Sequence, residues 1–382
     1  MTADTVSVAD LTADPHPILH RLREEGPVSW IPALDAWLVA SHEHSVQVLL
    51  DPDTFTVDDP RFSTQQVIGP SMLSLDGAEH RRHRDPFAGP FRAARVRELQ
   101  DFALDTANRL LSEAAAKRAV DLRSEVAGPL AVEVMARVLD LHAVEVADVL
   151  EWYEEIVDAV HAVTQGEPVP KSGHEAFAAL ASAVAGNRSS SALLAPVEED
   201  GKLSVDEIAS NVAVLLFGGI VTSESSSAIA FRYLLDDPAL MDTLREDRTA
   251  IRPFVEETFR LEPSAAAVDR YATRDIVLAG EEISAGDLVR VSLSGANRDP
   301  AVFADPDRFD LNRDFGRSVT FARGPHACLG IHLARLEAVA AVTAVVDRPG
   351  VVAGDLDPIT GLVFRAPEKV AVNWPGDATS VE

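Results

Sequence analysis

The chain contains one cysteine among its 382 residues. One cysteine excludes an internal disulfide and every metal site built from several cysteines, so the sequence favours a reducing compartment. Basic residues are also scarce, because 34 lysines and arginines stand against 61 acids and give a formal net charge of −27. A charge of this sign argues against general binding to nucleic acid or to an anionic membrane surface.

Long apolar runs are absent as well. No uncharged apolar stretch reaches the ~18 residues of a transmembrane helix, and the nearest one, Asn211–Ser223, ends at Glu224. The first ten residues carry acids where a secretory signal would need basic residues and then an apolar run. With 47% hydrophobic and 25% charged residues, the composition is typical of a globular protein. We therefore expect a soluble, cytoplasmic protein.

Most of the chain has the apolar spacing of helices. Between residues 86 and 261, apolar residues recur at intervals of three and four. Asp206–Leu235 is apolar on most sides and predicts one long buried helix. A last helix is expected from about Leu329 to Val346. Neither a repeat nor a linker rich in proline, glycine and serine divides the chain, so we expect a single domain over residues 1–382.

Short strands are expected outside this helical body. Candidates lie near residues 28–41, 276–293 and 362–372, the last as a hairpin of Leu362–Phe364 with Val370–Val372. Nothing indicates a doubly wound sheet. The predicted fold class is mainly α with small β-sheets (α+β).

The cysteine lies in the most informative stretch, Phe321-Ala-Arg-Gly-Pro-His-Ala-Cys-Leu-Gly330. The last helix is expected directly after Cys328. A thiol at a helix N-terminus faces free amide groups and the positive end of the helix dipole, and both favour the thiolate. Gly324 and Gly330 leave the backbone bare on both sides, so a flat ligand can come close. A buried structural cysteine is the alternative, and the two glycines favour a metal-bound thiolate.

This stretch resembles the haem-binding signature of the cytochrome P450 family, Phe-x-x-Gly-x-x-x-Cys-x-Gly. Phe321, Gly324, Cys328 and Gly330 occupy all of its specified positions. The resemblance covers nearly the whole chain. It implies the triangular-prism fold of that family, haem b (iron protoporphyrin IX) as cofactor and Cys328 as the iron ligand. A thiolate ligand pushes electron density onto the iron and favours O–O cleavage.

A second motif of the family is a buried Glu-x-x-Arg pair behind the haem. Glu257 and Arg260 match it at the spacing of helix neighbours. In the family an arginine from a later segment completes the pair, and Arg308 in Phe303-Ala-Asp-Pro-Asp-Arg-Phe309 matches that arginine. We take these three residues as structural.

Haem carries two propionates, which need cationic or hydrogen-bonding partners. His80 and Arg84 stand four residues apart, on one face of an expected helix. The resemblance makes them propionate partners, together with Arg270 and His326. For His80 the alternative is a solvated surface histidine.

The long helix contains Phe217-Gly-Gly-Ile-Val-Thr-Ser-Glu-Ser-Ser-Ser227, whose glycines and hydroxyls weaken a helix centre. Gly218, Gly219 and Thr222 match the family's oxygen-binding segment, Ala/Gly-Gly-x-Asp/Glu-Thr. Close helix packing through small residues is the alternative.

Val221 stands where this segment normally carries an acid. In the family the acid and the alcohol relay protons to iron-bound oxygen, and valine carries no proton. Three outcomes stay open: water or substrate relays the protons, Glu224 reaches in through a bend, or the enzyme needs no such delivery.

By resemblance, the substrate pocket lies over the haem. The candidate wall residues are apolar, which favours an apolar or aromatic ligand. They are Phe62, Ile68, Met72, Phe217, Val221, Ala266, Val268 and Val363. For each of them, plain core packing is the alternative.

The segment His80–Arg97 has a positive local charge, opposite to the net charge of the chain, because it carries six arginines against Asp85. The resemblance places it on the cysteine side of the haem, where an acidic ferredoxin would dock. The arginines assigned to this face are Arg81, Arg82, Arg92, Arg95 and Arg323. A solvated helix face is the alternative.

The resemblance as a whole implies a monomeric, bacterial-type monooxygenase. It would oxidise a small-to-medium apolar or aromatic molecule by hydroxylation, epoxidation, demethylation or ring coupling, in secondary metabolism. Dioxygen and two NAD(P)H electrons would be used, delivered by a separate ferredoxin and ferredoxin reductase because no such module is fused. Val221 motivates one alternative, a peroxide-driven or non-oxygenating haem-thiolate enzyme. An alternative of another class is a haem protein that only recruits a partner.

Overall fold

The computed structural model describes residues 3–117, 119–140, 146–164, 167–187, 197 and 202–374. Parts of the predicted helical body lie outside the described residues. They are residues 118, 141–145, 165–166, 188–196 and 198–201. Contacts within the chain define two compact units, which we describe separately. Unit 1 comprises Met1–Phe55, Leu99–Leu130 and Thr222–Glu382, and unit 2 comprises Thr56–Glu98 and Ala131–Val221.

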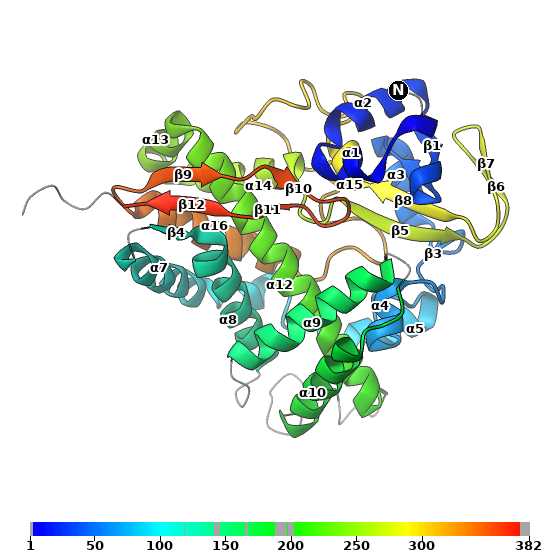
Figure 1. Ribbon diagram of the computed structural model, residues 1–382, viewed down its shortest axis with the longest axis horizontal. Helices are drawn as coiled ribbons and strands as arrows, with labels where there is room; N and C mark the ends of the chain where they lie inside the picture. The colour runs from blue at the N-terminus through cyan, green and yellow to red at the C-terminus, as the bar shows by residue number, and fades with distance from the viewer. Residues whose placement is uncertain are drawn as a thin grey trace, which may run out of the picture. The chain divides into compact units, whose positions relative to one another are not determined.

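The described chain is mostly helical (Figure 1). Its shorter helices are α1 Val8–Ala13, α2 His16–Glu25, α3 His42–Leu50, α4 Ser63–Ile68, α5 Gly77–Arg84, α6 Ala93–Arg97, α13 Pro238–Glu246, α14 Ile251–Leu261 and α15 Leu293–Asn297. The longer ones are α7 Gln100–Ala116, α8 Gly128–Leu139, α9 Val146–Thr164, α10 Lys171–Asn187, α12 Val205–Asp236 and α16 Ile331–Asp347. The long helix and the last helix therefore begin and end within two residues of their predicted limits.

The strands form small sheets. The largest has the order β1-β2-β8-β5-β3, and its strands are β1 Val28–Ile31, β2 Ala36–Val39, β3 Phe55–Thr56, β5 Ala267–Ala272 and β8 Leu288–Ser292. The others pair β6 Ile276–Leu278 with β7 Glu281–Ile283, β10 Ile359–Thr360 with β11 Ala366–Pro367, and β12 Val370–Asn373 with both β4 Ala119–Asp121 and β9 Val352–Leu356. The predicted class, mainly α with small sheets, is confirmed.

The predicted terminal hairpin is wrong in its pairing. Leu362–Phe364 is not a strand, because it belongs to the turn between β10 and β11, whereas Val370–Val372 pairs with β4 and β9. At Gly361 the backbone has φ +123°, and a Cβ would lie within 1.8 Å of the Phe364 carbonyl oxygen. Only glycine fits this turn, and Leu362 and Val363, which directly follow it, form no strand.

In unit 1 the large sheet carries much of the core. Valines of β1, β2 and β8 pack with Phe55 and with residues of α3 and α15 in one buried cluster. Figure 1 shows α1, α2, α3 and α15 gathered at this sheet. Residues of α1 and α2 form a second cluster with Ile31 and Leu38. The sheet and these helices thus bury apolar side chains in two clusters.

Among the described residues, α12 is the one helix long and apolar enough to cross a membrane by length and composition. Within its most apolar stretch, 72% is buried inside the protein. Burial of this kind is typical of the core helix of a globular protein.

A buried ionic cluster joins distant parts of unit 1. Arg365, 2% exposed, donates to the Glu262 carboxylate at 3.2 Å and to the carbonyl oxygens of Gly361 and Ile359 at 2.8 Å. His16 of α2 and Arg298 also contact Glu262. These cations lower the pKa of Glu262 against the opposing effect of its burial. The cluster fixes the turn between β10 and β11 to α2 and to the end of α14.

Candidate functional site

The cysteine loop closes on itself before α16 begins. The Cys328 amide donates to the Phe321 carbonyl oxygen at 2.9 Å, and the Ala327 amide donates to that of Gly324 at 3.1 Å. Cys328 is exposed and stands three residues before Ile331, the first residue of α16. The thiol is therefore accessible at the N-terminal end of a 17-residue helix, where the helix dipole favours the thiolate.

The structure explains the two glycines of this loop in different ways. Gly324 has φ +74°, and a Cβ there would lie 2.4 Å from the Leu49 carbonyl oxygen of α3. Only glycine satisfies both the backbone angle and this close approach. At Gly330 a Cβ would lie 3.9 Å from the Cys328 sulfur, which is an ordinary contact. Packing therefore requires Gly324, whereas Gly330 leaves bare surface beside the sulfur.

Phe321 anchors the start of the loop. Its ring meets that of Phe259 edge to face at 5.7 Å between centroids. The Arg335 guanidinium of α16 lies 5.2 Å from the Phe321 ring centroid and forms an ion pair with Glu256 at 2.7 Å. An aromatic ring held between α14 and α16 in this way fixes the loop from which Cys328 emerges.

Glu257 and Arg260 form the predicted buried pair on α14. Both side chains are 0% exposed, and two hydrogen bonds of 2.7 and 2.8 Å join them. The arginine that completes the pair is Arg313, whose Nε lies 3.0 Å from Glu257 Oε1. Arg313 also donates to the carbonyl oxygens of three residues in the same loop.

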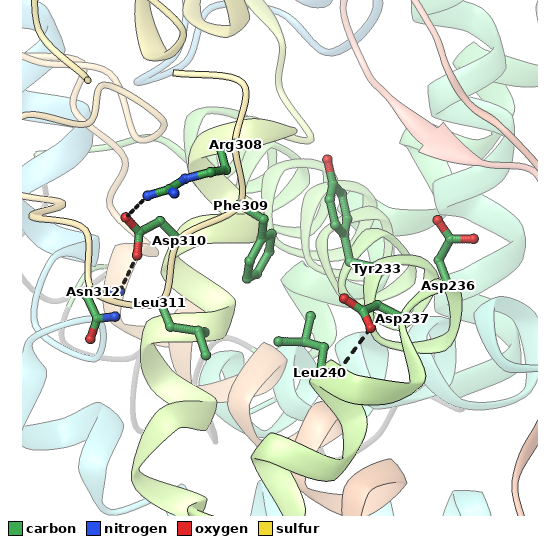
Figure 2. A pocket seen from close by; sticks show the side chains of 9 residues that line it. All are labelled: Tyr233, Asp236, Asp237, Leu240, Arg308, Phe309, Asp310, Leu311 and Asn312. Carbon is green, nitrogen blue, oxygen red and sulfur yellow. Dashed lines mark hydrogen bonds and ion pairs between the residues drawn. The ribbon is translucent and has the colours of Figure 1, made fainter. Parts of the chain in front are cut away.

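The prediction of Arg308 for this role is wrong. Its side chain is 67% exposed and pairs with Asp310 at 3.2 Å. Figure 2 shows Arg308 and Asp310 on the wall of a pocket of about 550 Å³ in unit 1, beside the end of α12. Five residues further along the loop, Arg313 is 7% exposed and turned inward. Motif order alone cannot tell which of two arginines in an irregular loop faces the core.

The four predicted propionate partners divide between the two units. His80 and Arg84 lie on α5 of unit 2, where His80 is 3% exposed. Arg270 lies on β5 of unit 1 and is 6% exposed, and His326 is half-buried in the cysteine loop. Buried cations are costly unless an anion or hydrogen bonds compensate them. Their assignment to propionates stays a prediction.

One face of α12 is open. Gly218 is exposed, and Val221 and Thr222 are half-buried, whereas residues 211–217, 220 and 223 are buried. Positions 218, 221 and 222 share a helix face by their spacing. A Cβ at Gly219 would lie 2.5 Å from the sulfur of Met135 on α8, but at Gly218 it would meet nothing within 4 Å. Close packing therefore explains Gly219, and an accessible face fits Gly218 and Thr222.

Glu224 is held on another side of α12. Its carboxylate accepts a hydrogen bond from Arg123 Nε at 2.8 Å. Arg123 is fixed in turn, since it donates to the Pro367 carbonyl oxygen at 2.9 Å. This ion pair gives Glu224 a structural partner and argues against its acting as the displaced acid, a role that stays a prediction.

One buried acid, Glu337 of α16, belongs to none of the motifs described above. It is 1% exposed, and neither carboxyl oxygen has a hydrogen-bond partner among the described residues. Burial raises the pKa of Glu337 to about 8. The Ser223 hydroxyl of α12 is near enough to lower this pKa, though not in full hydrogen-bonding geometry. In the sequence, Glu337 could have been noticed as the single acid within the apolar run Leu336–Val346.

The predicted pocket walls are connected within each unit. In unit 2, the Met72 amide donates to Asn211 of α12 at 2.8 Å, and the Ser210 hydroxyl donates to the Ile68 carbonyl oxygen at 2.6 Å. Ile68, Met72 and Phe217 are buried, and Phe62 is half-buried. The segment that carries Ile68 and Met72 is therefore fastened to α12.

In unit 1, the Ala266 amide donates to the Val363 carbonyl oxygen at 2.7 Å. Val268 follows Ala266 on β5, where it pairs with Val291 of β8. The turn after Gly361 is thus bonded directly to the start of β5. Whether these residues contact a substrate stays a prediction.

The predicted arginine face carries less unpaired positive charge than its sequence suggests, because some of its arginines are bound within the chain. Arg82 pairs with Glu207 at 2.6 Å and holds the pKa of that acid at about 2, and Arg95 pairs with Glu98 at 3.1 Å. Arg323 of unit 1 donates to carbonyl oxygens of its own loop. Arg81 and Arg92 are exposed, and neither has an ion pair within the described chain. These two arginines retain the charge that an acidic partner would meet.

The residues of unit 1 fit a thiolate-bound haem in their chemistry. An exposed cysteine at a helix N-terminus supplies the iron ligand, and the bare backbone at Gly330 leaves room for a flat ring beside the sulfur. The buried Arg270 offers a cation of the kind that propionates require.

Comparisons with known proteins agree with this chemistry. The model of the family described as cytochrome P450 matches residues 187–349. Cytochrome P450 107B1 of Saccharopolyspora erythraea is 33% identical over 362 residues, which cover 88% of this chain and 87% of that protein. The cytochrome P450 monooxygenase PikC of Streptomyces venezuelae is 32% identical, with 91% of this chain and 87% of that protein covered.

Solved structures show the same likeness. P450BioI, solved in complex with hexadec-9Z-enoic acid ligated acyl carrier protein, superposes with a TM-score of 0.86 at 26% identity and covers 95% of this chain and 98% of its own. CalO2 superposes with a TM-score of 0.84 at 28% identity, covering 95% and 96%. These superpositions confirm the predicted cytochrome P450 fold.

Proposed function

Because this chain belongs to the cytochrome P450 family and is a haem-thiolate monooxygenase, we propose that it oxidises a small-to-medium apolar or aromatic molecule. The reaction is a hydroxylation, epoxidation, demethylation or ring coupling in secondary metabolism. The observation that carries the proposal is the cysteine loop, where Cys328 is exposed and Gly324 allows the close approach of α3.

The bound haem iron supplies the oxidising chemistry. Cys328 would hold the iron as a thiolate, and His80, Arg84, Arg270 and His326 would neutralise the propionates. Thr222, half-buried on the same face of α12 as Gly218, would supply a hydroxyl that can hold a proton.

The proposed wall residues offer no charge to a substrate. All eight are apolar, and the segments that bear them are hydrogen-bonded to α12 in unit 2 and to β5 in unit 1. A fixed apolar wall selects an apolar ligand by shape. The names of the relatives support the broad range of proposed reactions, since they include a vitamin D(3) 25-hydroxylase and a nocardicin C N-oxygenase.

A ferredoxin and its reductase are the proposed electron donors, with NAD(P)H as source, in the cytoplasm of a cell where the enzyme acts as a monomer. The exposed Arg81 and Arg92 support an acidic partner. Arg81→Glu and Arg92→Glu should each slow reduction by a ferredoxin, and added salt should slow the wild type. Arg109→Glu is the control, because Arg109 lies on α7, outside the predicted face, and is as exposed as the two test residues. Equal reduction rates in all three variants would contradict this face.

The decisive test is the carbon monoxide spectrum of the reduced protein. The wild type should show a Soret band with the red shift of a thiolate ligand, and Cys328→Ala should lose that shift. A wild type without a Soret band would overturn the function altogether. A compound library screened for the high-spin shift of the oxidised protein would then identify the substrate class. A haem protein that only recruits a partner would show no turnover of any compound found.

A second candidate function is a peroxide-driven or non-oxygenating haem-thiolate enzyme. Two observations favour it: Val221 carries no proton, and Glu224 is held by Arg123. Comparing product formation with hydrogen peroxide alone and with ferredoxin, reductase and NAD(P)H separates the two. Faster turnover with peroxide would favour the second candidate.

A further inference from the structure

The side chain of Asn211 joins three parts of unit 2. Asn211 lies on α12 and is 0% exposed. Its amide oxygen Oδ1 accepts a hydrogen bond from the Met72 amide at 2.8 Å. Its nitrogen Nδ2 donates to the Glu207 carbonyl oxygen at 2.7 Å and lies 2.9 Å from Nδ1 of His83 on α5. One buried amide group thus connects α5 and α12 with residues 68–72, here called the wall segment because it carries two proposed pocket residues.

The direction of this amide group is fixed by two partners of opposite kind. The Met72 N–H can only donate, so it requires the amide oxygen of Asn211. The Glu207 carbonyl oxygen can only accept, so it requires the amide nitrogen. The second N–H of that nitrogen therefore faces His83 Nδ1, which must accept it. His83 consequently carries its proton on Nε2 and none on Nδ1.

The surroundings of His83 favour this neutral ring. The residue is 1% exposed, and two charged groups act on it, Arg82 of α5 and Glu207 of α12. Nε2 lies 3.1 Å from the Arg82 guanidinium and 3.4 Å from the Glu207 carboxylate, which itself pairs with Arg82 at 2.6 Å. Burial, and then the Arg82 cation, lower the pKa of His83 below its ordinary value of 6.5.

Other titratable groups lie on α5, on the turn that follows it and around the start of α12. His80 and Arg84 are the proposed propionate partners. The others are exposed to solvent: Glu79, Arg81, Asp85, Lys202 and Asp206. Exposed charges act weakly on a buried ring because water and salt screen them.

A second proton on His83 would reverse the amide group. That proton must go to Nδ1, where Asn211 already donates, and two donors cannot bond to each other. If Asn211 turned its oxygen toward the protonated ring, its NH₂ group would face the Met72 N–H, another donor. A buried N–H without an acceptor is unfavourable, so the backbone at Met72 would leave α12. The Ser210 hydroxyl would still hold the Ile68 carbonyl oxygen, at 2.6 Å.

We propose that His83 positions the wall segment according to pH: the neutral ring holds Met72 against α12 through Asn211, and the protonated ring releases it. Ligands of the substrate pocket should therefore bind more weakly in acid. His83 and Asn211 are positioning residues in this scheme, and neither contacts the substrate. The inference rests on the proposed function, which makes Ile68 and Met72 walls of the pocket.

The first test reads the tautomer of His83 directly. Nitrogen-15 NMR of the histidine-labelled protein is recorded on the diamagnetic complex of reduced haem with carbon monoxide. At about pH 7.5 the His83 ring should carry its proton on Nε2 alone, and it should gain a second one only below pH 6.5. The signal is identified by its loss in His83→Asn. A proton on Nδ1 at about pH 7.5 would overturn the proposal.

The second test measures hydrogen exchange of the Met72 amide at about pH 7.5 and about pH 5. His83→Asn keeps an amide oxygen near the place of Nδ1 and does not titrate, so it should protect Met72 at both pH values. Asn211→Leu removes the acceptor of the Met72 N–H and should expose it at both. The wild type should match His83→Asn at the higher pH and exchange about fivefold faster than it at the lower pH, a factor that corresponds to one hydrogen bond.

Comparing variants at one pH cancels the intrinsic pH dependence of exchange. His42→Asn is the control, because His42 is a buried histidine of unit 1, 8% exposed, that bonds to the Arg317 carbonyl oxygen. This variant should keep the pH dependence that the wild type shows at Met72. Equal Met72 exchange in the wild type and His83→Asn at both pH values would overturn the proposal.

The third test measures ligand binding to the oxidised, haem-loaded protein. The probe is 4-phenylimidazole, whose binding to the iron shifts the Soret band and whose phenyl ring occupies the pocket. Its Kd should be equal for the wild type and His83→Asn at about pH 7.5, and about fivefold higher for the wild type at about pH 5. Imidazole has no phenyl ring and should bind both proteins equally at both pH values.

These outcomes distinguish the inference from the proposed function. A protein without a Soret band would overturn the proposed function, while hydrogen exchange at Met72 still decides whether His83 controls the wall segment. Normal haem absorbance with Met72 exchange that His83→Asn leaves unchanged would overturn the inference alone. If Met72 exchange follows pH but the Kd ratio for 4-phenylimidazole stays constant, the positioning of the pocket by His83 is refuted.

Discussion

Replacing Glu337 by glutamine should remove a pH dependence from the stability of this protein. The folded chain holds this acid at a pKa of about 8, against an ordinary value of 4.5, because burial penalises its charge. Between these two pH values the folded state binds one more proton than the unfolded state. The stabilisation is therefore complete below about pH 4.5 and is lost as the pH rises to about 8.

The size of the change in unfolding free energy follows from this pH range. Each pH unit within it costs about 1.4 kcal/mol of unfolding free energy. Raising the pH from about 6 to about 8 should thus cost the wild type about 2–3 kcal/mol more than it costs Glu337→Gln. Such a difference is large against the ~5–15 kcal/mol of a typical domain. The effect needs no correction for solvent screening, because the side chain is buried.

Urea unfolding of the haem-loaded protein at several pH values measures this difference. The wild type and Glu337→Gln are compared at each pH, so that all other titrations cancel. Glu368→Gln removes an exposed acid and should leave the pH dependence of the wild type unaltered. Parallel stability curves for the wild type and Glu337→Gln would refute a neutral buried carboxyl group.

Four other substitutions test the site in different ways. Arg313→Met should cost about 1.5–3 kcal/mol of unfolding free energy, because it removes a charge-assisted hydrogen bond to the buried Glu257, which keeps only Arg260 as a cationic partner. Arg308→Met should stay within ~0.5 kcal/mol, and similar urea midpoints for both would contradict the assignment. Glu224→Gln should lower stability by about 1 kcal/mol and leave oxygen-dependent turnover unchanged; unchanged stability with lost turnover would make Glu224 the acid. Gly324→Ala should reduce the haem content, seen as Soret absorbance per protein, and full haem loading would refute the close approach to α3.

The helices and the cysteine loop were predictable from the sequence because their signals are local. Asp206–Leu235 differs from α12 by one residue at each end, since apolar periodicity records burial directly. Phe321, Gly324 and Cys328 form a motif of fixed spacing, and φ +74° at Gly324 gives the physical reason for one of its positions.

Features that depend on tertiary contacts were not predictable in this way. Leu362–Phe364 is a short apolar run of the kind found in strands, but Arg365 binds the backbone around it and holds it as a turn. Arg313 and Arg308 differ only in which one a loop turns inward. Glu337 was visible as a lone acid in an apolar helix, yet nothing in the sequence showed that Ser223 would face it.

The Arg365 cluster also sets an order on folding during synthesis. Thr12 and His16 leave the ribosome long before Arg365, which contacts the Thr12 carbonyl oxygen and shares Glu262 with His16. A nascent chain therefore cannot complete this part of its core until Arg365 has been made. Contacts between residues so distant in the chain also make folding slow. Removing the first 16 residues should consequently disturb the turn between β10 and β11, at the opposite end of the sequence.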